Sequence, residues 1–123
     1  MKIVKYSLKH EKDLFTAISN DPDWEWFIKN KNTYKRFLQN SITFACYNNK
    51  DFCGYIRAIQ DIESFVYISE LYVLPKWRKN KVGQALIERV KNNYSNFTVY
   101  ALSDEDEYYL KKGYKKIGSV FEI

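Results

Sequence analysis

The stretch of sequence that decides the fold is residues 70–86, ELYVLPKWRKNKVGQAL. It begins inside a run rich in Val, Ile, Tyr and Leu, and Pro75 ends that run because proline has no backbone N–H for pairing. From Val82 onward, apolar residues recur at offsets of three and four, as on one face of a helix. The stretch therefore predicts a strand, a turn and a helix. We name residues 78–83 the basic turn.

The basic turn occupies a position at which a helix can bind an anion. The first N–H groups of a helix have no partner within it, and they concentrate about half a positive charge. Arg78, Lys79 and Lys81 add cationic side chains, and Gly83 has no Cβ to keep a phosphate from the backbone. Alone, this pattern is more typical of a solvated loop with a helix cap. The neighbouring sequence must distinguish that loop from an anion-binding site.

The residues before this stretch predict strands separated by two helices. The strands are expected at 2–6, 42–47, 52–60 and 65–74. The last should be the longest, and polar connections should join the last three into an antiparallel meander. The helices fall between the first two strands. Ser7 is expected to cap one and Asn32 the other, with a break at Pro22.

The residues after the basic turn predict a crossover and a well-defined final helix. A strand at 97–102 follows the helix, so it should run parallel to the strand at 65–74. Ser103 is expected to cap the last helix and Gly113 to end it, with residues 114–123 forming a terminal strand. The sequence thus predicts an α/β fold of the α+β type, whose mixed, mostly antiparallel sheet has about six strands and about four helices.

Length and composition limit the possible classes of protein. The 123 residues, of which 46% are hydrophobic, fit one domain over residues 1–123. The net charge of +5 is spread along the chain, which argues against a nucleic-acid face, and no apolar run is long enough for a membrane span. Two cysteines are too few for a four-ligand zinc site built from thiols alone, and the single histidine does not change that. We expect a cytoplasmic protein with Cys46 and Cys53 as buried thiols, placed opposite each other in a hairpin.

Two segments resemble motifs of one enzyme family. Residues 70–86 resemble the acyl-CoA-binding motif of the GNAT N-acetyltransferase superfamily, with matches at Leu71, Val73, Pro75, Arg78 and Gly83. Lys81 stands in place of the first glycine of that motif. Residues 108–114 resemble the family's F/Y-Y-x-x-x-G-F/Y segment. The order of predicted elements is similar to the family's over essentially the whole chain.

The resemblance implies that acetyl-CoA is the co-substrate. In such proteins the two parallel strands separate and pantetheine lies between them. The residues implied to bind it are Leu71, Tyr72, Val73, Arg78, Lys79, Asn80, Lys81, Val82, Gly83, Gln84 and Ala85. Tyr109 matches the family's acid tyrosine, which protonates the departing thiolate. A packed aromatic without a catalytic role is the alternative.

The base implied by the resemblance is less well defined. The family often places Glu or His four or two residues before the position of Leu71, where this chain has Tyr67 and Ser69. Glu70 is the nearest carboxylate. Strand alternation points it to the opposite face of the sheet unless a bulge intervenes, so a structural carboxylate is the default. A water relaying protons from Tyr67 is an equal candidate.

The acceptor is expected near residues 21–27, where the family's substrate loop lies. Asp23 and Glu25 alternate there with Trp24 and Trp26, a pattern that can hold a cationic amine. The alternative is a capped turn with Trp24 in the core. The expected function is therefore transfer of an acetyl group to a primary amine of a small molecule or protein, by a monomer or homodimer. A catalytically weak module that binds acyl-CoA or a protein partner is the alternative.

Overall fold

The computed structural model describes all residues, 1–123, as a sheet of five strands with helices on both sides. The strands are β1 (Lys2–Lys5), β2 (Ile42–Asn48), β3 (Asp51–Asp61), β4 (Phe65–Val73) and β5 (Thr98–Ala101). The helices are α1 (Glu11–Ile18), α2 (Glu25–Lys29), α3 (Lys31–Gln39), α4 (Val82–Asn93) and α5 (Asp106–Lys111). Short 3-10 turns cover Leu8–His10, Pro22–Trp24 and Pro75–Trp77. None of the helices combines the length and apolar character that a membrane span requires.

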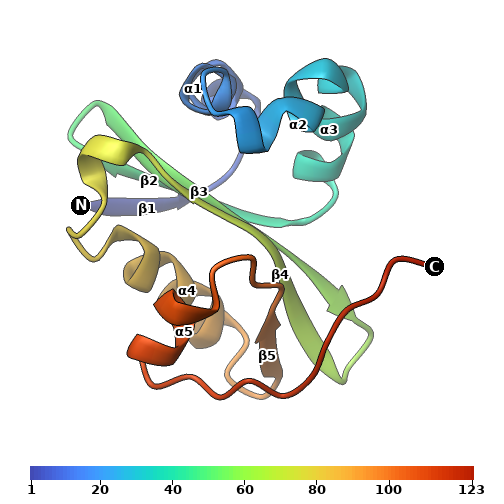
Figure 1. Ribbon diagram of the computed structural model, residues 1–123. Helices are drawn as coiled ribbons and strands as arrows, with labels where there is room; N and C mark the ends of the chain where they lie inside the picture. Colours follow the sequence, from blue (N-terminus) through green and yellow to red (C-terminus); the bar gives the residue numbers. More distant parts are fainter.

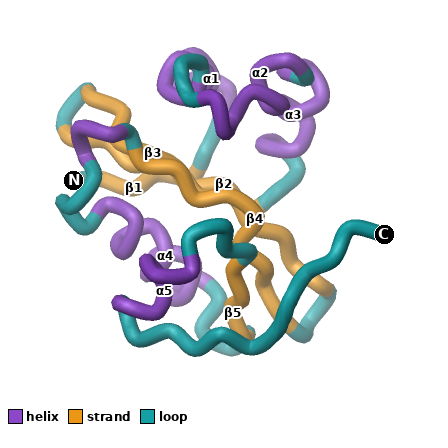
Figure 2. The backbone as a smooth tube through the Cα atoms, viewed as in Figure 1, coloured by secondary structure: helices purple, strands orange, loops and turns teal.

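The strands follow one another across the sheet in the order β1-β2-β3-β4-β5. All neighbouring pairs are antiparallel except β4 and β5, which are parallel. The predicted meander and crossover are therefore confirmed. Helices α1, α2 and α3 lie on one side of the sheet, while α4 and α5 lie on the other (Figure 1). Figure 2 shows that the residues after α5 run on as an irregular tail past β5.

Each face of the sheet is covered by its own hydrophobic core. On the α4 side, Val82, Leu86 and Val90 pack against strand residues such as Ile56 and Ile68. On the other side, residues of α1 and α3 pack with Tyr55 and Tyr72, among them Leu14, Ile18, Tyr34 and Leu38. Burial on both faces explains why the central strands are almost continuously apolar.

A β-bulge in β4 changes which side chains face which core. Arg57 pairs with Glu70 but the next residue of β3, Ala58, pairs with Ile68, so Ser69 is an extra residue in β4. Before the bulge, Ile68 faces the α4 side. After it, Leu71 packs on the α4 side while Tyr72 lies in the core of the other side. The bulge therefore sets the orientation of everything from Glu70 to the end of the strand.

Several predicted details of the helices and strands are wrong. The longest strand is β3, with 11 residues against nine for β4, because pairing with both neighbours extends it. Helix α3 begins at Lys31, so Asn32 lies in its first turn. Helix α5 begins after Glu105, although Ser103 Oγ still accepts a bond of 3.1 Å from the Glu105 N–H.

The predicted terminal strand and cysteine pairing are also wrong. Residues 114–123 form no strand, because their backbone pairs with no edge of the sheet, and the sheet has five strands. In the hairpin a bulge places Cys46 opposite Gly54 rather than Cys53. Both cysteines are buried free thiols, as expected.

Candidate functional site

Strands β4 and β5 separate halfway along β4 and leave part of its edge open. Their pairing ends at Ile68 and Ala101, after which the Leu102 N–H donates to the Ile68 carbonyl at 2.9 Å. Residues 69–73 of β4 pair with no strand on that side, and we name them the open edge. The Tyr72 carbonyl points the other way, toward Gly54 of β3, where an added Cβ would collide with it. The backbone groups of Leu71 therefore face the open edge.

The N-terminus of α4 lies beside the open edge and offers unpaired donors. The N–H groups of Val82, Gly83 and Gln84 bond to no protein atom, and the first bond of the helix is donated by Ala85 to the Lys81 carbonyl at 3.0 Å. Leu71 packs against the core to which Val82 belongs. The arrangement combines free donors, the positive end of a helix dipole and an open strand edge, which fits a phosphate group followed by an extended chain.

The basic turn has a backbone conformation that favours glycine. Lys79 and Lys81 have φ angles of 66° and 63°, in the left-handed region. This conformation gives a physical reason for a glycine at the position of Lys81 in similar sequences. Lys79, Asn80 and Lys81 are exposed, so their side chains are available to an anion.

The Arg78 side chain does not join the other cations of the basic turn. Its Nε donates to the Val73 carbonyl at 2.9 Å, and its guanidinium lies 5.9 Å from the ring centre of Tyr72 and 4.0 Å from Asp21. Tyr72 belongs to the core on the α1 side. Arg78 therefore holds the end of β4 and points away from the α4 N-terminus.

Two adjacent tyrosines of α5 reach the site differently. A Cβ added at Gly83 would lie 2.6 Å from Tyr108 Oη and 3.7 Å from Leu71 Cδ2, so the Tyr108 hydroxyl lies against the first turn of α4, which also packs on the Leu71 side chain. Tyr109 lines a groove on the β5 side. Burial, followed by the neighbouring Tyr108, raises the pKa of Tyr109 to about 12, and burial raises that of Tyr108. Both phenols are protonated at neutral pH and can donate a proton.

A groove of about 760 Å³ runs between β5 and the irregular tail. Its walls include Tyr67, Ala101 and Tyr109, together with residues 114–120 of the tail. Because Ile68 and Leu102 also line it, the groove reaches the point where β4 and β5 separate. An acceptor lying in this groove would approach the open edge from the Tyr67 side.

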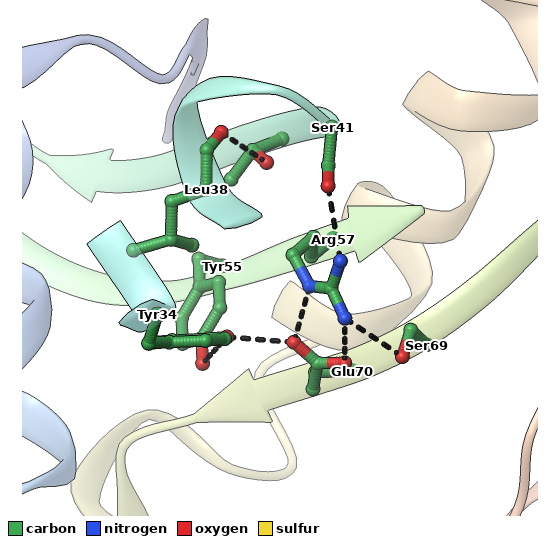
Figure 3. Close-up of polar contacts among 8 residues, drawn as sticks. Tyr34, Leu38, Ser41, Tyr55, Arg57, Ser69 and Glu70 are labelled. Atoms are coloured by element: carbon green, nitrogen blue, oxygen red, sulfur yellow. Dashed lines mark hydrogen bonds and ion pairs between the residues drawn. The ribbon is translucent and has the colours of Figure 1, made fainter. Parts of the chain in front are cut away.

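Glu70 lies in a buried polar network on the α1–α3 side (Figure 3). Arg57 donates from Nε to Glu70 Oε1 at 2.5 Å and from Nη2 to Oε2 at 2.7 Å. Tyr34 also donates to Oε1 at 2.7 Å, which leaves Tyr55 to donate to Tyr34 at 2.7 Å. Burial raises the pKa of both tyrosines. With both carboxylate oxygens bonded, Glu70 is poorly placed to accept a proton from an amine.

The residues predicted for the acceptor are only partly brought together. Trp24 packs edge-on against Tyr55 and Tyr72, in a turn capped by Asp21, which accepts from the Asp23 N–H at 3.0 Å. Glu25 pairs with Lys29 in solvent. None of these residues lines the groove beside Tyr67.

Trp26 has a different neighbourhood from the rest of that segment. It is half exposed and stacks on Phe37, and Arg57 lies 5.4 Å from the Phe37 ring centre. Arg57 also donates to Ser69 Oγ at 3.0 Å. Of the predicted acceptor residues, Trp26 and Ser69 are thus linked through Phe37 and Arg57.

Sequence reasoning did not single out Tyr108, Arg57 or Tyr34 as parts of the site. The doubled tyrosine at 108–109 was a usable signal, because two consecutive residues of a helix face different neighbours. Arg57 carried the signal of a charged residue inside an apolar strand. No group of His, Cys, Asp or Glu is arranged to hold a metal ion.

Comparisons with solved structures agree with this fold. The aminoglycoside 6'-acetyltransferase type Ii has a TM-score of 0.79 at 21% identity, covering 96% of this chain and 85% of that one. The aminoglycoside 6'-N-acetyltransferase AAC(6')-IG from Acinetobacter haemolyticus has a TM-score of 0.76 at 14% identity, covering 100% and 97%. An aminoglycoside 6'-N-acetyltransferase complexed with coenzyme A has a TM-score of 0.70 at 18% identity, covering 92% and 73%.

At these identities the solved structures establish the fold alone. A search of curated protein sequences found no significant match. The family profile described as "Acetyltransferase (GNAT) domain" matches residues 15–123, which is most of the sequence. The chain therefore belongs to the GNAT acetyltransferase family.

Proposed function

We propose that this protein transfers an acetyl group from acetyl-CoA to a primary amine. One observation carries the proposal: the free N–H groups of Val82, Gly83 and Gln84 lie beside the open edge of β4. A pyrophosphate would accept from the helix N-terminus, and the pantetheine arm would lie along Leu71 and Val73. The related fold crystallised with coenzyme A supports this choice of co-substrate.

In the proposed reaction the protein positions the thioester and supplies one proton. The Leu71 N–H would bond the carbonyl oxygen and stabilise its developing charge. The amine nitrogen forms a bond to the carbonyl carbon, the C–S bond breaks, and Tyr109 protonates the departing thiolate. The amine must enter neutral, and a water beside Tyr67 would take the proton that the nitrogen then loses. Tyr108 is a second candidate acid, because its hydroxyl lies against Gly83 at the start of α4.

The amine is proposed to enter through the groove beside Tyr67. Several similar folds belong to aminoglycoside acetyltransferases, so an aminoglycoside is one reasonable acceptor to test. Small diamines and peptide amines are the others.

A direct test is the release of free thiol from acetyl-CoA with each class of amine, with the acetylated product identified by mass. Turnover with any amine supports the proposal. The matched control is Gly83→Val, whose side chain would collide with the Tyr108 hydroxyl and contact Leu71, and which should therefore lower thiol release. Coenzyme A binding without thiol release from any amine would favour the alternative, a module that binds acyl-CoA without turnover.

A further inference from the structure

The Arg57 network consists of residues from separate parts of the chain gathered at the bulge of β4. Its members are Tyr34, Ser41, Tyr55, Arg57, Ser69 and Glu70. All three guanidinium nitrogens of Arg57 are used: Nη1 donates to Ser41 Oγ at 3.0 Å, while Nε and Nη2 bind Glu70. The side chains of Arg57 and Glu70 are 11% and 7% exposed, so the pair is shielded from water.

One feature of the network distinguishes it from an ordinary buried ion pair. Consecutive residues of a regular strand point to opposite faces of the sheet. Yet Ser69 Oγ and Glu70 Oε2 lie 3.0 and 2.7 Å from the same atom, Nη2 of Arg57. Only the bulged backbone brings both side chains to one face, so the guanidinium binds the bulged conformation and not a regular strand (Figure 3).

The bulge in turn determines the proposed acyl site. Pairing with β5 ends at Ile68, immediately before the bulge, and Leu71 follows it by two residues. Without the extra residue, the alternation of backbone groups along β4 would be shifted by one position. The N–H of Leu71 would then face β3 instead of the open edge. The bulge is therefore required for Leu71 to face the open edge.

We infer that Arg57 is a positioning residue for acetyl transfer, which holds the β4 bulge and thereby aims the Leu71 N–H at the thioester oxygen. This inference rests on the proposed function. Arg57 lies on the face of the sheet opposite the α4 N-terminus, so it acts through the backbone of β4 and not by contact with coenzyme A. It should affect the chemical step more than the affinity for the co-substrate.

The main test separates positioning from stability. Arg57→Met alone leaves the buried Glu70 carboxylate without its counter-charge, with only the Tyr34 hydroxyl still bonded to it, and is expected to weaken the fold. The double variant Arg57→Met/Glu70→Met removes both charges together, a change that often leaves stability intact. We expect the double variant to melt near the wild type, with kcat lowered about 10- to 100-fold and KM for acetyl-CoA within about threefold. Arg36→Met is the control, because Arg36 is exposed and bonds only within α3.

A milder variant and a measurement without turnover complete the test. Ser69→Ala removes one bond to Arg57 and should lower kcat by about two- to fivefold with little change in melting temperature. In protein labelled with ¹⁵N-leucine, the Leu71 amide signal should move in the double variant and stay in place in Arg36→Met.

The outcomes separate this inference from the proposed function. If the double variant is stable, keeps kcat within twofold of the wild type and leaves the Leu71 amide unmoved, the inference is overturned. If the wild type itself releases no thiol, the proposed function fails. In that case the Leu71 amide signal still tests whether Arg57 holds the bulge. A moved signal would support this structural role of Arg57, but no role in acetyl transfer.

Discussion

The basic turn and the Arg57 network lie on opposite faces of β4, and they are built in opposite ways. The basic turn is one contiguous segment, exposed to solvent over residues 78–81, and its donors are backbone groups at the start of α4. The Arg57 network is buried and combines α3, β3, β4 and the residue before β2. Contiguous backbone sites are visible in a sequence because local chain geometry creates them. A network of distant side chains becomes visible only after strand pairing is known.

The largest effect should come from breaking the buried pair. Replacing Glu70 with Leu leaves the Arg57 guanidinium without its counter-charge, and we expect a loss of about 3–5 kcal/mol of unfolding free energy, measured in urea. Glu25→Leu is the control, because the Glu25–Lys29 pair is exposed and should contribute at most about 0.5 kcal/mol. Equal losses of unfolding free energy in both variants would contradict the expected difference between the buried Arg57–Glu70 pair and the exposed Glu25–Lys29 pair.

The next effect concerns the proton donor. Tyr109→Phe should lower kcat for acetyl transfer about 100-fold or more, because it removes the proposed acid and keeps the aromatic packing. Tyr108→Phe is the matched comparison on the preceding residue and should lower kcat less than tenfold. The measurement is thiol release at saturating acetyl-CoA. A larger loss in Tyr108→Phe would move the acid role to Tyr108, whose hydroxyl lies against Gly83 at the start of α4.

A smaller effect is expected in the basic turn. Lys81 has a φ of 63°, which disfavours a side chain, so Lys81→Gly should raise the free energy of unfolding by about 1 kcal/mol or less. Lys76→Gly is the control: Lys76 lies in the 3-10 turn and its φ is not positive, so glycine should destabilise there. Thermal melts compare the two variants. A lower melting temperature in Lys81→Gly would show that the lysine is stabilised by contacts beyond its backbone.

The smallest effect concerns pH: we expect that Tyr109 causes no decline in log kcat/KM at alkaline pH. Burial raises the pKa of Tyr109 to about 12, so its proton is present throughout the range below that value and is lost only as the pH rises through it. Log kcat/KM should therefore rise as the amine deprotonates and stay level to about pH 10. A decline with an apparent pKa near 10, absent in Tyr109→Phe, would show that the phenol titrates normally.

Much of the fold could be predicted from the sequence, since the elements are defined by local patterns. The meander, the crossover and the helix after the basic turn follow from periodicity and turn residues such as Pro75. The two bulges could not be predicted, because an extra residue at Ser69 or Cys53 leaves the composition of its strand unchanged. The terminal strand failed for a related reason: residues 114–123 carry strand-forming side chains but pair with no edge.

The features of the site also fall into those set by neighbouring residues and those set by strand pairing. The sequence by itself determined a strand ended by Pro75, a basic turn and the free N–H groups of α4, because each depends on neighbouring residues. Only the tertiary structure decided that Arg78 points away from that turn, that Tyr108 reaches Gly83, and that Glu70 is bound by Arg57 and Tyr34. Apart from the Arg78–Val73 bond, these contacts join residues 13 or more positions apart in the chain. Their geometry is set by strand register, which the pairing of whole strands determines.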